Sequence, residues 1–81
     1  MKGQLRIDSM YAFIQLDPAD NTEGVIAFLD PVSHMWMPAV GADMERVEQV
    51  RSIAELTAKS TGHPVQLVHF THREEIEVIE P

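Results

Sequence analysis

Four histidines are the first candidates in this sequence for side chains that take part in chemistry. His69 and His72 are spaced as H-x-x-H, and converging imidazoles are what a zinc site needs. On an extended strand these two positions face opposite sides, so they could share a metal only if a turn at Thr71 intervened. Without further ligands nearby, the spacing favours a half-buried strand histidine followed by an exposed loop histidine. We therefore predict no metal ligand and no cofactor.

The acidic segment 17–24 suggests a second kind of chemistry, the binding of calcium through side-chain oxygens. Oxygen-bearing side chains fall at alternating positions from Asp17 to Glu23, loosely as in a calcium loop. The match fails at Ala19, which has no side-chain oxygen, and at Thr22, which stands where such loops need glycine. The segment is therefore predicted to be a solvated hairpin loop.

Nothing in the sequence marks a catalytic residue. No serine is flanked by glycines as in a nucleophile elbow, and the four glycines are too scattered to form a phosphate-binding loop. The chain has no cysteine, which excludes thiolate nucleophiles and disulfide bonds. A non-catalytic protein is therefore favoured. The alternative is a small enzyme or ligand-binding protein whose site forms between subunits from carboxylates and from His34, His69 and His72.

The segment Met35-Trp36-Met37-Pro38 carries the clearest indication of a binding surface. Tryptophan anchors many interfaces, and methionine adapts to irregular partner surfaces. An alternative interpretation is that the lone tryptophan closes the core of a small domain, because most tryptophans are largely buried. Two aromatic residues of the first predicted strand complete a candidate interface. Its residues are Met35, Trp36, Met37, Tyr11 and Phe13.

Four segments have the apolar composition of strands, at residues 10–16, 25–29, 34–40 and 65–70. The first two are expected to form a hairpin around the acidic loop. The third is expected to be an edge strand, because Pro38 cannot donate a hydrogen bond to a ladder. Residues 71–80 combine a capping-box pattern with alternating glutamate and aliphatic residues, and we predict a turn that leads into a short strand.

Residues 43–61 form the clearest helix in the sequence. Asp43 is a good N-cap, and Gly62 followed by Pro64 is a stop signal. Apolar residues recur at three- and four-residue steps and form one stripe, with charged residues opposite. We predict an α+β fold in which a small antiparallel sheet of three to five strands carries this one amphipathic helix on one face, in the order β-β-(β)-α-β-(β).

The length and composition limit the partners of the protein. The whole chain, residues 1–81, is predicted to be a single domain with residues 1–9 as a loose lead-in. Its net charge of −7 disfavours nucleic acid, because an acidic surface repels phosphate groups. The longest apolar run, residues 25–29, is too short to cross a membrane. The lack of cysteine and of a signal-peptide pattern favours a cytoplasmic protein.

The predicted fold leaves apolar surface without cover. One helix covers one face of a sheet, yet the first two strands are apolar on both sides. We therefore expect a small protein–protein interaction or regulatory domain that forms a homodimer or another homo-oligomer, or binds a protein partner, through sheet surface. A variant of this hypothesis is an acidic inhibitor of a basic, nucleic-acid-binding protein surface, which the net charge alone supports.

Overall fold

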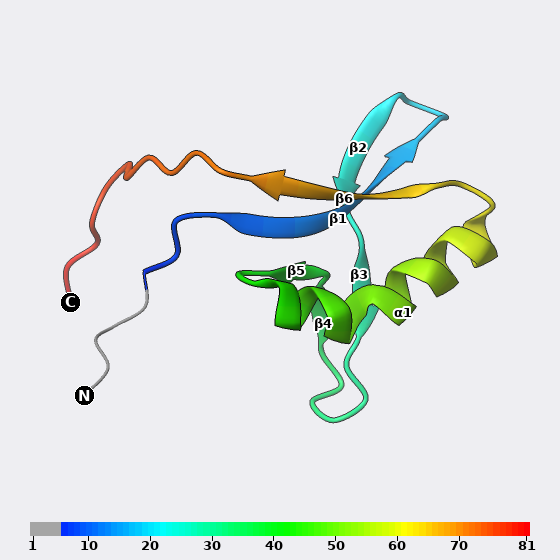
Figure 1. Cartoon of the computed structure of the whole chain (residues 1–81), viewed down its shortest axis with the longest axis horizontal. Coiled ribbons are helices and arrows are strands. Elements are labelled where there is room, and N and C mark those ends of the chain that lie inside the picture. The colour runs from blue at the N-terminus through cyan, green and yellow to red at the C-terminus, as the bar shows by residue number, and fades with distance from the viewer. Residues whose placement is uncertain (1–5) are drawn as a thin grey trace.

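The computed structural model describes residues 6–81 and confirms the predicted α+β architecture (Figure 1). Its elements are β1 (Met10–Asp17), β2 (Thr22–Val25), β3 (Ala27–Leu29), β4 (Trp36–Pro38), β5 (Val40–Gly41), α1 (Met44–Thr61) and β6 (Val65–Phe70). Each of their strand pairs is antiparallel. The predicted lead-in at 1–9 can be followed only over residues 6–9, which contain no helix or strand, because residues 1–5 lie outside the described residues.

β1 is the central strand of the larger sheet. Along one edge it pairs with β6, from Met10 to Gln15. Along the other edge it pairs with β5 near its start and with β2 near its end. β3 and β4 form a second, two-stranded sheet. A strand with neighbours on both edges and apolar residues on both faces is what the composition of this segment predicts.

Three backbone segments meet at Phe13, Ile26 and Ala39 and join the two sheets. The Phe13 N–H donates to the Ala39 carbonyl (3.0 Å), the Ala39 N–H donates to the Ile26 carbonyl (2.9 Å), and the Ile26 N–H donates to the Phe13 carbonyl (3.0 Å). The three bonds form a closed ring, which we call the three-way junction. All three residues are buried, and the ring pairs both backbone groups of each one.

The three-way junction accounts for two differences from the predicted strands. Segment 25–29 is not one strand, because β2 pairs with β1 up to Val25 whereas β3 pairs with β4 from Ala27 onward. Segment 34–40 is likewise divided, into β4 and β5, at Ala39. Such a change of partner depends on contacts between distant residues, which no local pattern encodes. β4 does lie at the edge of its two-stranded sheet, as its proline predicts.

α1 begins and ends where the sequence predicts. The Asp43 side chain accepts a hydrogen bond from the Arg46 N–H (3.0 Å) and caps the first turn. Gly62 adopts the left-handed conformation (φ 76°), and its N–H donates back to the last turn of the helix. Gln15 of β1 ties this end of the helix to the sheet, because its side-chain amide donates to Thr61 Oγ1 (2.8 Å).

The core lies between α1 and one side of the strands, as the position of α1 beneath β1 and β6 shows (Figure 1). It combines the side chains of the three-way junction with one stripe of α1. Its buried residues are Phe13, Ile26, Ala39, Val47, Val50 and Ala54. We call the side of the strands that packs against α1 the inner face, and the opposite side the outer face.

The chain after β6 differs from its prediction. Residues 71–81 contain neither a helical turn nor a strand. The segment runs away from the strands (Figure 1), and its aliphatic residues Ile76, Val78 and Ile79 are 63–84% exposed. The predicted turn and short strand are therefore wrong, because the alternating segment has no partner strand and a strand is not stable without one.

Candidate functional site

The strand register determines which side chains share the outer face. Directly opposed residues of an antiparallel pair point to the same side, and neighbours along a strand alternate. Because Phe13 points into the core, Ala12 and Ile14 point outward, and so do their partners Val40 and Val25. The same rule applied to every strand pair defines the whole outer face. Its residues are Met10, Ala12, Ile14, Leu16, Glu23, Val25, Ala27, Leu29, Trp36, Pro38, Val40, Gln66, Val68 and Phe70.

The outer face is apolar except at Glu23 and Gln66. Several of its apolar side chains are open to solvent: Val25 is 45% exposed, Phe70 51% and Trp36 71%, whereas Ala12 and Ile14 on β1 are buried. No helix or strand of residues 6–81 lies over this face, because α1 packs on the inner one. Exposed apolar surface that extends over several strands marks an interaction site in a folded domain.

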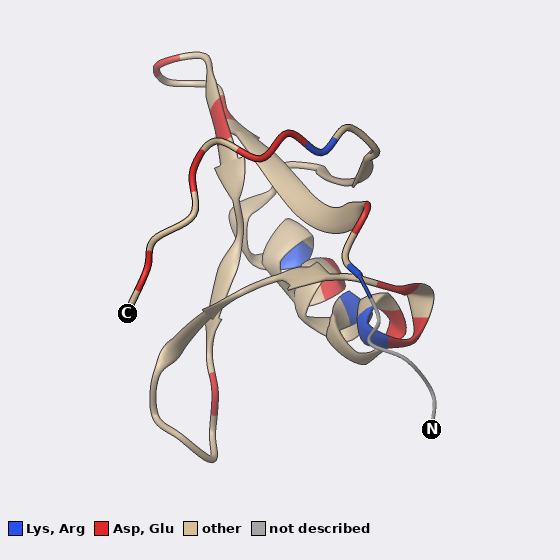
Figure 2. Ribbon diagram, turned by 90° about the vertical axis from the view of Figure 1, so that its left-hand side faces the viewer, with Lys and Arg blue, Asp and Glu red and all other residues tan. Residues whose placement is uncertain are grey.

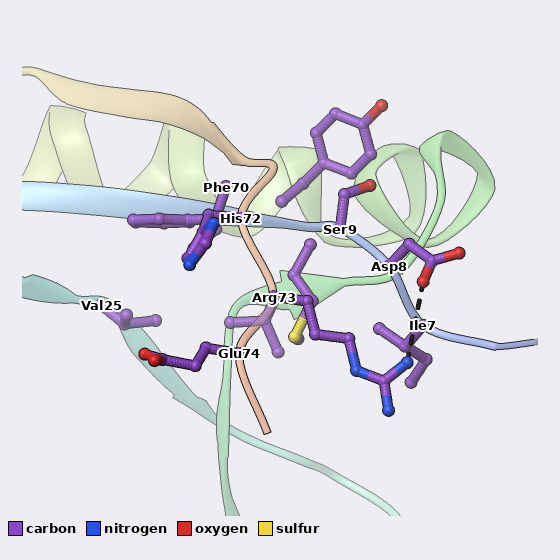
Figure 3. A pocket seen from close by; sticks show the side chains of 12 residues that line it. Ile7, Asp8, Ser9, Val25, Phe70, His72, Arg73 and Glu74 are labelled. Atoms are coloured by element: carbon purple, nitrogen blue, oxygen red, sulfur yellow. Dashed lines mark ion pairs between the residues drawn. The ribbon is translucent and has the colours of Figure 1, made fainter. Parts of the chain in front are cut away.

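One end of the outer face is hollowed to a volume of about 450 Å³ (Figure 3), and we call this cavity the outer hollow. Its floor is apolar and its rim is mostly polar, because residues 7–9 and 72–74 pass along its side. The floor includes Met10, Ala12, Val25, Val40 and Phe70. The rim includes Ile7, Asp8, Ser9, His72, Arg73 and Glu74.

Two arginines share one carboxylate beside the outer hollow. Arg6 Nε lies 2.8 Å from Asp8 Oδ1. Arg73 Nη1 lies 3.7 Å from the same oxygen, as the dashed line in Figure 3 marks. Arg6 and Asp8 are largely exposed and Arg73 is 42% exposed, so these ion pairs contribute little to stability. They hold the two terminal segments beside each other just past the point where β1 and β6 stop pairing.

The structure divides the predicted interface residues between the two faces. Trp36 lies on the outer face, and Met35 is exposed in the turn before it. Met37 and Tyr11 belong to the inner side of their strands and are half-buried, although Tyr11 also lines the outer hollow, and Phe13 is in the core. The alternative in which the tryptophan closes the core is wrong, because its side chain is largely exposed. The sequence could not separate these residues, since β1 is apolar on both faces and only the position of α1 shows which face is covered.

The four histidines occupy four different places. His34 lies in the turn between β3 and β4 with a left-handed backbone (φ 60°), and His63 follows α1. His69 points to the inner face, where its ring stacks on Tyr11 with the ring centroids 4.2 Å apart. His72 lines the outer hollow. Within residues 6–81, no three histidine or carboxylate side chains are grouped closely enough to hold a metal ion.

The carboxylates of the acidic segment cap the turn between β1 and β2. Asp17 Oδ1 accepts a hydrogen bond from the Ala19 N–H (3.0 Å). Asp20 Oδ1 accepts from the Thr22 N–H (3.2 Å) and from the Thr22 hydroxyl (2.6 Å). The hydroxyl holds the pKa of Asp20 below its ordinary value, because the bond favours the charged carboxylate. These aspartates act as short polar side chains do in turns, by bonding to the backbone two residues on.

The outer hollow cannot be foreseen from the sequence alone. Its floor comes from four strands, and their convergence depends on the three-way junction. One local signal was present, because Met10, Ala12, Ile14 and Leu16 alternate with the aromatic residues of the same strand and predict a second apolar face. That signal shows that a second face exists but not its shape.

Comparisons with known proteins give no further guide to the site. No family model, curated protein or solved structure matched the chain. Among residues 6–81 there is no helix with both the length and the apolar character that crossing a bilayer requires. The geometry of the outer face and the outer hollow is therefore the basis for a functional proposal.

Proposed function

We propose that this chain is a small interaction module that self-associates, and that two copies contact each other through the outer face. The observation that carries the proposal is the apolar outer face, which no helix or strand within residues 6–81 covers. Covering such surface with protein is favourable by about 25 cal/mol for each Å² of apolar area removed from water. A second copy that covers the outer face would gain this free energy.

The surface area of the chain supports the same proposal. A compact monomer of 9.1 kDa has an accessible surface of about 4,900 Å², whereas this chain exposes 6726 Å². The difference, about 1,800 Å², includes the extended segment 71–81 as well as the outer face, and it is in the range that each chain of an obligate homodimer buries in its interface. The radius of gyration, 15.0 Å, likewise exceeds the roughly 12 Å expected for a compact domain of this length.

The distribution of charge is compatible with contact between two acidic chains. The net charge of −7 would oppose association if the charged side chains lay on the contact surface. The outer face carries Glu23 as its charged residue, whereas other charges lie on α1, in turns and on the segments before β1 and after β6 (Figure 2). Two copies can therefore meet through the strands of the outer face without bringing the carboxylates of α1 and of the turns together.

The oligomeric state of the full chain tests this proposal. Sedimentation equilibrium over a wide range of micromolar concentrations should show a reversible dimer. Leu29→Lys places a charge on the outer face and should weaken the dimer strongly, because an interfacial charge without a partner is costly to desolvate. Leu56→Lys is the matched control, since Leu56 is exposed on α1 and lies away from the outer face.

Two results would count against the proposal. A native chain that remains monomeric at the highest concentration overturns self-association. A dimer that the two lysine variants weaken equally shows that the outer face is not the contact surface. Circular dichroism of each variant at low concentration checks that the single chain still folds.

A further inference from the structure

We propose further, on the basis of the proposed function, that the outer hollow of each copy is occupied by the C-terminal segment 75–80 of a second copy. The segment carries what the outer hollow is suited to bind. Its residues Ile76, Val78 and Ile79 are exposed in the single chain, although aliphatic side chains of this size are usually buried. The floor of the outer hollow, in turn, includes three apolar side chains that are 37–51% exposed, Met10, Val25 and Phe70, around the buried Ala12 and the half-buried Val40.

The alternation of the segment suits contact with an apolar floor on one side and water on the other. In an extended backbone, Ile76 and Val78 point to one side, whereas Glu75, Glu77 and Ile79 point to the other, so the alternation covers residues 75–78 and ends at Ile79. The aliphatic side chains can therefore enter the outer hollow, whose volume of about 450 Å³ holds several such groups, while the carboxylates stay in water. Branching at Cβ also favours the extended conformation that this contact requires.

The segment is poorly placed to cover the outer hollow of its own chain. Glu74 is the last residue along the chain that lines the hollow, and the chain beyond it runs away from the strands (Figure 1). A return would need a tight turn, yet residues 71–80 contain no Gly, Pro, Asn or Asp, which are the residues that tight turns use. A second copy can receive the segment without any turn.

A dimer with two-fold symmetry fills the outer hollow of both copies at once. The segment and the outer hollow adjoin on the same chain, so a two-fold axis beside the hollow brings the segment of each copy to the hollow of the other. Six residues in an extended backbone span about 20 Å, which is enough to cross a cavity of this volume. The exchange is complete in a dimer and leaves no site for a third chain, because each segment is then covered and each outer hollow is filled.

Cross-linking between two cysteine variants tests the exchange directly, because the chain has no cysteine of its own. Val25→Cys marks the floor of the outer hollow, and Val78→Cys marks the segment. Mild oxidation of a mixture of the two variants should produce a disulfide between different chains. Val32→Cys is the control for the first variant, because Val32 is exposed in the turn between β3 and β4, outside the hollow. Its mixture with Val78→Cys should give little product.

Two cross-linking results would overturn the exchange. One is an equal yield of disulfide from both mixtures, which would indicate random collision. The other is an intrachain disulfide in a chain that carries both Val25→Cys and Val78→Cys at low concentration. That product would show that the segment folds onto the outer hollow of its own chain.

A pair of serine substitutions measures how much the segment contributes to the dimer. Ile76→Ser combined with Val78→Ser should raise the dissociation constant at least about 100-fold, since burying each aliphatic side chain is worth about tenfold or more. Both residues are exposed in the single chain, so circular dichroism should show an unchanged fold. Glu75→Gln combined with Glu77→Gln is the matched control and should leave the dimer intact.

The same measurements separate the two proposals. A native dimer that resists the serine variant but is dissociated by Leu29→Lys overturns the exchange of segments and leaves the proposed function standing. A native chain that is monomeric at every concentration overturns both. A dimer that the serine variant dissociates while the glutamine variant does not, together with the selective cross-link, supports both.

Discussion

Replacing Trp36 with alanine separates the stability of the single chain from the stability of the dimer. The indole lies on the outer face beside its cross-strand partner Leu29, and the single chain buries less than a third of it. Full burial of a tryptophan removes 150–250 Å² from water, so the buried part contributes about 1 kcal/mol to the free energy of unfolding. Trp36→Ala should therefore leave the single chain folded.

Association is expected to depend on the same side chain much more strongly. Each indole exposes about 150 Å², so a contact between two copies that covers half of this area on each indole removes about 150 Å² in total from water. At about 25 cal/mol for each Å², this contributes up to about 4 kcal/mol to association. Since about 1.4 kcal/mol corresponds to a factor of ten, the substitution should raise the dissociation constant by about 100-fold to 1,000-fold.

Sedimentation equilibrium and fluorescence measure this effect independently. Sedimentation gives the dissociation constants of the native chain and of Trp36→Ala. In the native chain the lone tryptophan is itself a probe, so its emission should shift to the blue, and its quenching by iodide should fall, as the concentration rises. Leu56→Ala serves as the control, because it removes an exposed apolar side chain from α1 and should not change the dissociation constant.

Two results would refute this reasoning. If Trp36→Ala unfolds at concentrations at which the native chain is a folded monomer, the indole supports the core and is not free for a partner. If the variant folds and associates as the native chain does, Trp36 lies outside the interface. The contact would then be confined to the end of the outer face that contains the outer hollow.

Three further predictions concern the fold that supports the outer face. Ala39→Leu should lower the free energy of unfolding by about 1–3 kcal/mol, because Ala39 is fully buried at the three-way junction and the added carbons have no space; an unchanged Tm would show that the junction can expand. Gly62→Ala should lower the free energy of unfolding by about 1–2 kcal/mol, because Gly62 has a left-handed φ. Gly24→Ala should leave Tm nearly unchanged, because its added Cβ meets nothing within 4 Å. Equal losses of stability in the two variants would contradict this difference. The Ser33 hydroxyl bonded to Asp30 (2.7 Å) holds the pKa of this carboxyl below 3.8 in the folded chain. The charged Asp30 therefore stabilises the fold at pH values above its pKa in the unfolded chain, and this stabilisation is lost as the pH falls through its pKa in the folded chain. As the pH is lowered, Tm should fall less steeply for Asp30→Asn than for the native chain. Parallel curves of Tm against pH would contradict this prediction.

The elements with strong local signals could be predicted from the sequence. α1 follows from an N-cap at Asp43, a left-handed C-cap at Gly62 and an apolar stripe between them, all of which act within a few residues. β1 and β6 follow from runs of apolar and aromatic residues, whose high strand propensity needs no knowledge of the partner. The class of fold then follows, since one amphipathic helix and a few antiparallel strands have few ways to pack.

The elements whose form depends on distant partners could not be predicted. Segment 25–29 has the composition of one strand but changes partner at Ile26, because the three-way junction draws on three parts of the chain. Segment 71–80 has the alternation of a strand, yet no strand among residues 6–81 pairs with it. Tyr11 and Phe13 are as apolar as their neighbours in β1, and only the position of α1 turns them into core residues.

The sequence by itself determined that this protein has more apolar strand surface than one helix can cover, because alternation and helix periodicity are local properties. Only the tertiary structure decided which side is left open and that Trp36 lies on it. The reason is physical. The choice of face depends on the register of β1 with β2 and β5 and on the ring of hydrogen bonds at the three-way junction, and these contacts join residues that are far apart along the chain.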